Sequence, residues 1–235
     1  MKKFLLSLIV VVFSLELLNA QQYVATTPTK KNVILEEYTG SNCTYCPDGH
    51  KIANEMAANY PGRIFPINIH AGGYAPLSYP NMTTAAGNEF NGSFGVNSYP
   101  SGVVNRATGV IGRNMWEDKS VEQMHKTAIV NIAGDYTINA STRTAEITVE
   151  IYYTENSANS TNYLNIFMLQ DNIIGHQVGS NLNPAQIVDG QYCHTHVFRS
   201  TVTSTWGDAI TPTTGSLITK TYTYTIPETI GDPNG

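Results

Sequence analysis

The stretch TGSNCTYCP, residues 39–47, decides the fold that we expect for the first half of the chain. It joins an apolar run, residues 32–38, to a segment with helical spacing of apolar residues, residues 48–60. Cys43 and Cys46 are therefore expected where a strand gives way to a helix. The free N–H groups and the dipole at a helix N-terminus stabilise a thiolate. A Cys-x-x-Cys pair placed there has the geometry of a dithiol that cycles with a disulfide.

The two cysteines leave three interpretations open. They can form a redox-competent dithiol, a purely structural disulfide, or half of a zinc site. A disulfide across so short a loop removes little chain entropy, so stability alone is a weak reason for it. Zinc would need two further ligands, which Cys193, His194 and His196 could supply. We favour the dithiol and assign no metal and no cofactor.

The N-terminus has the pattern of a secretory signal. Lys2 and Lys3 form a charged start, residues 4–13 are apolar, and Ala20 is a small residue suited to cleavage. The apolar run is too short for a comfortable membrane span, so we expect none. A signal at residues 1–20 implies export to an oxidising compartment, where a disulfide can persist.

Length and charge limit the class of protein. The 235 residues suit two ordinary domains. The formal net charge is −5 and the basic residues form no cluster, so nucleic acid is not expected as a partner.

The element order in the first half predicts a thioredoxin-like α/β domain. Residues 32–70 have a β-α-β pattern, whose two parallel strands must cross over with a right hand. The expected elements that follow are a helix at residues 83–94, a strand opening at Pro100, a hairpin turn at Thr108-Gly109 and a helix at residues 116–129. We place this domain at residues 32–130, after a polar linker at residues 21–31.

The second half changes to a period of two from about Asn131 onward. Alternation of apolar and polar residues indicates antiparallel strands with one solvated face, and hence a β-sandwich at residues 131–235. The expected strands are residues 135–140, 144–153, 163–171, 193–204 and 217–226. Five strands leave one edge of a sandwich open, so we expect the sandwich to be incomplete at the C-terminus.

The cysteine motif and a second motif carry a family resemblance. The stretch EEYTGSNCTYCPDG at residues 36–49 and the stretch SYPSGVVNR at residues 98–106 resemble the family named for a twenty-eight-kilodalton bacterial outer-membrane protein. The resemblance is clear over residues 33–106 and is limited to general pattern in the β-rich half.

The resemblance implies a set of site residues. Cys43 matches the attacking thiol and Cys46 the resolving thiol of thioredoxin-like proteins. Glu37 stands where a buried acid could take the proton of Cys46 during exchange. Pro100 matches a cis-proline, and the backbone of Tyr99 would pair with a substrate peptide.

Two functions follow from these expectations. The first is thiol–disulfide exchange on protein thiols or disulfides, at the periplasm, the outer membrane or the cell surface. The alternative is a non-catalytic outer-membrane or surface protein, an adhesion or assembly module that meets an envelope partner and holds a structural Cys43–Cys46 disulfide.

The histidines are expected to be less informative. His194 and His196 share a strand face and are interpreted as exposed strand residues. His50 and His70 either flank the cysteines or lie at the surface. If the halves are separate domains, Cys193 should lie far from Cys43.

Overall fold

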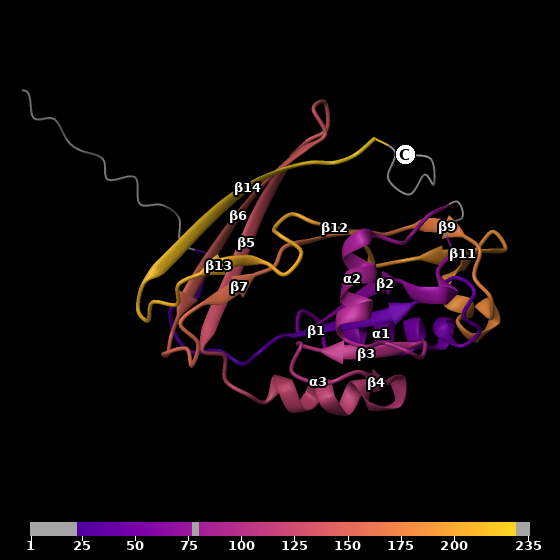
Figure 1. The fold of residues 1–235 in the computed structure, drawn as a ribbon, viewed down its shortest axis with the longest axis horizontal. Helices are drawn as coiled ribbons and strands as arrows, with labels where there is room; N and C mark the ends of the chain where they lie inside the picture. The colour runs from indigo at the N-terminus through magenta and orange to yellow at the C-terminus, as the bar shows by residue number, and fades with distance from the viewer. Residues whose placement is uncertain (1–22, 77–79, 229–235) are drawn as a thin grey trace, which may run out of the picture.

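The computed structural model describes residues 23–76 and 80–228, and its largest element is a mixed six-stranded sheet (Figure 1). The strand order is β4-β3-β1-β2-β12-β8. β2 runs parallel to β1 and β12, and the other neighbours are antiparallel. The strands are β1 (Val33–Thr39), β2 (Ile64–His70), β3 (Ser101–Val104), β4 (Ile111–Gly112), β8 (Phe167–Gln170) and β12 (Val197–Thr201). The signal sequence expected at residues 1–20 lies outside the described residues.

Helices cover both faces of this sheet. Helices α1 (Cys46–Asn59) and α3 (Trp116–Met124) pack on the face that carries Val33 and Leu35 of β1. Helix α2 (Ala85–Ser93) packs on the opposite face, against Tyr38 and the apolar side chains of β2. Burial on both faces explains why the first strand is an almost continuous apolar run.

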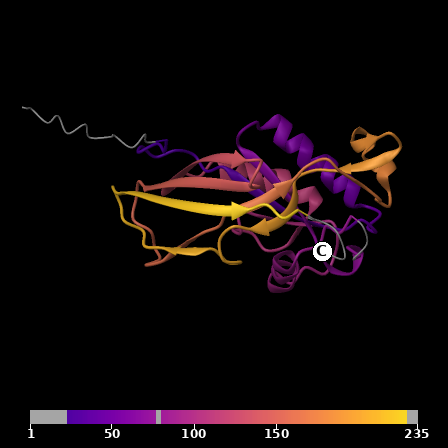
Figure 2. The ribbon, with the colours of Figure 1, turned by 90° about the horizontal axis from the view of Figure 1, so that it is seen from above.

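The rest of the chain forms three smaller sheets. The longest strands, β5 (Val130–Asn139), β6 (Thr144–Tyr153) and β14 (Leu217–Thr225), form an antiparallel sheet in the order β14-β6-β5. β7 (Asn162–Leu164) pairs with β13 (Asp208–Ile210), and β9 (Ile173–Gly175), β10 (Ile187–Val188) and β11 (Gln191–His194) form the third sheet. Short 3₁₀ helices lie at Gly72–Tyr74, Arg113–Met115, Ser180–Leu182 and Pro184–Gln186. The β14-β6-β5 sheet and the β9-β11 sheet lie at opposite ends of the molecule (Figures 1 and 2).

The expected fold class, a thioredoxin-like α/β domain followed by an antiparallel β-sandwich, is wrong. The chain is predominantly β, and its main sheet is completed by β8 and β12 from the second half. Val197 of β12 pairs with Asn68, and Phe198 packs beside Phe90 of α2. These contacts cover what would otherwise be an open edge of β2. The remaining strands are divided among sheets of three, two and three strands instead of two facing sheets.

The described part of the expected linker is packed against the β-rich half. Val24 is buried, and the backbone N–H groups of Tyr23 and Val24 donate to Oε2 of Glu150 on β6. The Asn131 side chain donates to the carbonyl oxygens of Ala25 and Thr27. Residues 23–31 therefore run along the start of β5. Within residues 23–76 and 80–228, the helices are all too short or too polar to cross a membrane.

Candidate functional site

The two cysteines of the motif are joined in a disulfide at the start of α1. Their Cα atoms lie 5.4 Å apart. Cys46 is the first residue of α1 and Pro47 follows it, a position where proline needs no N–H partner. We expected the helix N-terminus to stabilise a thiolate at Cys43. The helix begins three residues later, at Cys46.

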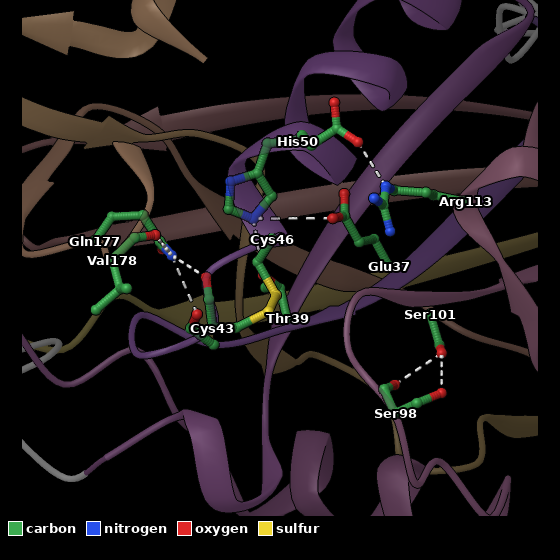
Figure 3. Close-up of a disulfide and its surroundings, with 12 residues drawn as sticks. Glu37, Thr39, Cys43, Cys46, His50, Ser98, Ser101, Arg113, Gln177 and Val178 are labelled. Atoms are coloured by element: carbon green, nitrogen blue, oxygen red, sulfur yellow. Dashed lines mark hydrogen bonds and ion pairs between the residues drawn. A yellow bond between two sulfur atoms is a disulfide. The ribbon is translucent and has the colours of Figure 1, made fainter. Parts of the chain in front are cut away.

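The disulfide is covered by a segment from the second half of the chain. Cys43 exposes 3% of its surface and Cys46 exposes none. Nε2 of Gln177 donates to the carbonyl oxygens of Cys43 (3.1 Å) and Gly40 (3.3 Å), and the N–H of Val178 donates to the carbonyl of Ser41 (2.8 Å) (Figure 3). We call residues 177–179 the cover segment. It satisfies backbone acceptors of the cysteine loop, within which both cysteines are buried.

Glu37, on β1, is fully buried next to the first turn of α1. Neither of its carboxylate oxygens has a hydrogen-bond partner. Burial raises the pKa of Glu37 well above its usual range, although the Arg113 guanidinium acts in the opposite direction. Arg113 is itself paired with Asp48 at 2.5 Å (Figure 3).

Gly49, in the first turn of α1, lets Glu37 and Pro100 lie close to the helix because it has no side chain. An ideal Cβ on Gly49 would lie 2.5 Å from Oε1 of Glu37 and 2.9 Å from Cγ of Pro100. A larger residue there would displace one of them. The Tyr99–Pro100 bond is cis, which confirms that expectation. The Tyr99 hydroxyl donates to Oδ1 of Asn91 at 2.6 Å.

Three histidines meet in the interior next to Glu37. Nε2 of His50 lies 3.9 Å from Oε1 of Glu37 and 2.8 Å from Oγ1 of Thr39. The rings of His50 and His70 lie 6.4 Å and 5.3 Å from the ring of His194. The histidines come from α1, β2 and β11, so both halves of the chain contribute.

Burial keeps this cluster uncharged. Desolvation lowers the pKa of His50 to about 3 and that of His194 to about 4, and it lowers the pKa of His70 as well. Burial raises the pKa of Glu37 and lowers that of His50, so it disfavours the charged form of both partners in the His50–Glu37 contact. The expectation that His194 is an exposed strand residue is wrong, since its exposed fraction is 1%.

A hydroxyl and two amides complete the cluster. The Tyr192 hydroxyl lies 2.8 Å from Nδ1 of His50 and donates to Oε1 of Gln186 (2.8 Å), and Asn183 lies in the same network. Cys193 is free and buried, and burial raises the pKa of its thiol. In the part of the chain that the structure describes, His, Cys, Asp and Glu side chains form no group of three arranged to hold a metal ion.

The structure therefore brings together most of the site residues expected from the sequence. Cys46, Glu37 and Pro100 meet around the first turn of α1, with Cys43 joined to Cys46. Sequence reasoning missed Gln177, Tyr192 and the buried position of His194. A glutamine in a polar loop carries no local signal, and only the long-range pairing of β9 with β11 places these residues here.

The hydrogen bonds of Gln177 lead to a prediction about the cover segment. We expect Gln177→Ala to speed reduction of the disulfide by dithiothreitol about tenfold, since each lost hydrogen bond contributes about 1 kcal/mol. The measurement is the rate of thiol release in native buffer. Gln191→Ala, at an exposed position on β11, is the matched control and should leave that rate unchanged. Equal rates for both variants would show that the cover segment does not protect the sulfur atoms.

Comparisons with known proteins identify relatives of this chain. A family model described as outer membrane protein Omp28 matches residues 87–234, more than half of the 235 residues. The matched region includes the second motif and the β-rich half, whereas the cysteine motif lies outside it. No curated protein matches the sequence.

Two solved structures share the fold. HBP35 of Porphyromonas gingivalis aligns with a TM-score of 0.67 at 19% identity, over 84% of this chain and 65% of that one. This chain thus spans about two thirds of the HBP35 structure. A structural-genomics crystal structure from Agrobacterium tumefaciens aligns with a TM-score of 0.51 at 13% identity, over 82% of this chain and 78% of that one. At these identities the likeness concerns the fold alone.

Proposed function

The chain belongs to the Omp28 family of outer membrane proteins, and from this premise we propose that it is a non-catalytic envelope protein with a structural Cys43–Cys46 disulfide. Family membership confirms an exported, outer-membrane-associated protein. The observation that carries the proposal is the burial of both cysteines beneath the cover segment.

Burial of the sulfur atoms argues against exchange in this state of the molecule. A thiolate must approach a disulfide sulfur directly, so access governs the rate of exchange. The cover segment donates three hydrogen bonds to the carbonyls of Gly40, Ser41 and Cys43. An incoming protein thiol would have to displace that segment first.

The disulfide has a structural role that fits the same contacts. It closes a loop of four residues, which in a chain-entropy estimate contributes about 2 kcal/mol. More importantly, it holds the loop from Gly40 to Cys43 in the shape that presents its carbonyl oxygens to residues 177 and 178. The disulfide thereby shapes the surface on which the cover segment packs.

The experiment that tests this proposal is the reactivity of the cysteines. We expect native protein to resist dithiothreitol, to give no catalysed reduction of insulin, and to be alkylated at Cys43 only after unfolding. Mass spectrometry after alkylation in native buffer and in denaturant provides the measurement. Rapid alkylation of reduced native protein at Cys43, with an apparent pKa below the roughly 8.5 of free cysteine, would contradict the proposal.

That contrary outcome would favour thiol–disulfide exchange as the second candidate function. The observation in its favour is the buried, unpartnered Glu37 with its raised pKa, next to the first turn of α1. In that mechanism Cys43 attacks a protein disulfide, Cys46 resolves the mixed disulfide, and Glu37 accepts the proton of Cys46. The backbone at Tyr99 and Pro100 would then contact the substrate peptide.

A further inference from the structure

The β14-β6-β5 sheet ends in a long strand whose outer edge is free. β14 pairs with β6 over its nine residues without a register shift, and in the described part of the chain it has no second neighbour. Figure 1 shows β14 as an outer strand at the β-rich end of the molecule. An unpaired strand edge offers a row of N–H and C=O groups to any further strand.

The register of the sheet shows which backbone groups of β14 face outward. Just beyond the strand, the N–H of Ile226 donates to the carbonyl of Arg143 (2.7 Å), so the even-numbered residues of β14 bond to β6. The odd-numbered residues alternate with them and point their N–H and C=O groups to the free edge. Within residues 23–76 and 80–228, no backbone group pairs with them. The outward-facing residues are all exposed: Leu217, Thr219, Thr221, Thr223 and Thr225.

The composition of β14 favours pairing along this edge. Natural sheets usually protect a long free edge with a proline, a bulge or several charged side chains. The sequence of β14, LITKTYTYT, contains no proline, its pairing with β6 has no bulge, and Lys220 is its one charged residue. Threonine, tyrosine and isoleucine, which make up most of it, are residue types that favour strands. The edge is therefore open to a further strand over its whole length.

The opposite edge of the same sheet, formed by β5, is less suited to pairing. Residues 23–31 run along its start, where the Asn131 side chain donates to two of their carbonyl groups. Its middle contains Gly134 and Asp135, two residue types that are depleted in strands. Of the two edges, that of β14 is the continuous one.

We propose that two copies of this chain associate by antiparallel pairing of β14 with β14, centred on Thr221. The sequence of the strand is nearly symmetric about this residue, with Thr219 and Thr223 at equal distances from it. In the proposed register Thr219 of one copy lies opposite Thr223 of the other, and such cross-strand threonine pairs stabilise sheets. The outward-facing residues of the two strands would exchange about ten backbone hydrogen bonds, a number typical of protein interfaces.

Charge and length select this register over its neighbours. With Thr221 at the centre, Lys220 lies opposite Tyr222 of the second copy, where an ammonium group and an aromatic ring attract each other. A register centred on Lys220 would place two ammonium groups directly opposite, which destabilises a strand pair. A register centred on Tyr222 would leave the first two residues of each strand unpaired. The inference goes beyond the proposed role of the disulfide, because it concerns backbone groups far from the cysteines and gives the envelope protein a partner, namely a second copy of itself.

The first test is the association state of the oxidised protein, measured by sedimentation equilibrium between about 10 μM and 1 mM. A contact made by one strand of each copy buries less than the standard interface of about 1,600 Å², so we expect a weak dimer with a Kd of about 10–100 μM. The measurement does not depend on cysteine reactivity. Its failure would therefore leave the proposed structural role of the disulfide untouched.

A proline on each edge locates the interface. Thr221→Pro removes an outward-facing N–H from each copy and leaves the bonds between β14 and β6 in place, because a proline is tolerated on an edge strand where its nitrogen faces solvent. We expect it to weaken dimerisation about thirtyfold, through the loss of two hydrogen bonds at the central pair. Tyr136→Pro is the matched control on the free edge of β5, where the bond from Thr154 N–H to Ile129 C=O places the even-numbered residues outward. It should leave the Kd unchanged.

Cysteine cross-linking tests the register. The two Thr221 Cα atoms would lie about 5.5 Å apart, so Thr221→Cys should form an intermolecular disulfide when diamide is the oxidant. In the same register the two Thr219 Cα atoms lie more than about 13 Å apart, so Thr219→Cys should not. The parent protein provides the background, since Cys43 and Cys46 are paired and Cys193 is buried. Covalent dimers are measured by electrophoresis without reductant.

Three results would overturn the proposal. The first is a protein that stays monomeric throughout the concentration range. The second is a dimer that Tyr136→Pro weakens as much as Thr221→Pro does. The third is equal cross-linking of Thr219→Cys and Thr221→Cys, which would exclude the antiparallel register centred on Thr221. Circular dichroism of each variant should match the parent protein, and if Thr221→Pro does not fold, the two cysteine variants decide the outcome.

Discussion

Lowering the pH from 7 to 4 is expected to unfold this protein steeply, because three buried histidines must take up protons that the folded state excludes. His50, His70 and His194 are each 1–2% exposed and lie together in one cluster. The groups that face them include Glu37, Tyr192 and Arg199, and burial raises the pKa of both Glu37 and Tyr192, which disfavours a compensating negative charge. The three histidines can therefore take up protons only when the cluster becomes exposed to water.

The sign of this effect follows from the direction of the pKa shifts. In the unfolded chain each imidazole has a pKa of about 6.5, whereas burial holds His50 at about 3 and His194 at about 4. Between these values the unfolded state binds more protons, so the free energy of unfolding falls with falling pH by about 1.4 kcal/mol per pH unit for each histidine. The loss begins below about pH 6.5 and continues to the folded pKa values.

Glu37 changes the free energy of unfolding with pH in the opposite direction and so reduces the net slope. Its folded pKa is raised, so it stabilises the folded state at low pH and loses that contribution as the pH rises through the folded pKa. Between the unfolded and the folded pKa of Glu37, its contribution to the slope of unfolding free energy against pH cancels that of about one of the three histidines. A net slope of about 3 kcal/mol per pH unit would exhaust a typical stability of 5–15 kcal/mol within a few pH units.

Urea unfolding followed by circular dichroism at several pH values provides the measurement. His194→Gln should reduce the slope of unfolding free energy against pH by about 1.4 kcal/mol per unit, since it removes one titrating group. His125→Gln is the matched control, because it removes an exposed imidazole that lies outside the buried cluster. A stability that stays constant between pH 7 and pH 4.5 would show that the histidines are not buried as a neutral cluster.

Local sequence patterns predicted many elements and few of their partners. The apolar spacing of Ile52, Ala53 and Met56 predicted a helix at residues 48–60, and α1 spans Cys46–Asn59. The period of two at residues 144–153 matches β6. Both patterns depend on side chains that are close in sequence. They are therefore the same whichever part of the chain the element packs against.

The two strands expected at residues 163–171 and 193–204 show why the fold class was wrong. Each is divided in the structure: the first into β7 and β8, the second into β11 and β12. One part of each joins a small sheet, while β8 and β12 join the main sheet. His196, between β11 and β12, has a positive φ of 54°, which turns the chain from one sheet to the other. Alternation of apolar residues continues through such a turn, so periodicity alone could not reveal it.

The candidate site shows the same division between local and distant information. Cys43, Cys46 and Pro47 form one short motif, and its position at the start of α1 follows from the local sequence pattern. The buried disulfide loop accepts hydrogen bonds from Gln177, which lies more than 130 residues away and shares no sequence pattern with the motif. The burial of the cysteines decides between two functions, because the motif alone is compatible with a reactive dithiol and with a structural disulfide.

Gly179→Ala is expected to lower stability strongly and to expose the disulfide, since it acts where the cover segment contacts the cysteine loop. Gly179 has a φ of +72°, which a residue with a side chain rarely adopts. An ideal Cβ at this position would also overlap the carbonyl oxygen of Thr44, a backbone atom that cannot rotate away. Backbone strain and steric overlap therefore add at one site.

The hairpin between β10 and β11 offers a control that separates these two causes. Gly190 has a φ of +78° in a two-residue turn with Asp189, and an ideal Cβ there meets nothing within 4 Å. Gly190→Ala should cost only the strain of a left-handed residue, about 1–2 kcal/mol. Gly179→Ala should cost that amount and about 1–3 kcal/mol more for the overlap.

Thermal unfolding and disulfide reduction together decide the outcome. For a chain of this size each kcal/mol lowers the Tm by about 2–4 °C, so the two variants should be clearly separated. Reduction by dithiothreitol in native buffer should be faster in Gly179→Ala and unchanged in Gly190→Ala, because only the first change displaces the cover segment from Thr44. If both variants lost equal stability and kept the parent rate of reduction, the contact between Gly179 and the cysteine loop would have no protective role, and access to the disulfide would have to be controlled elsewhere.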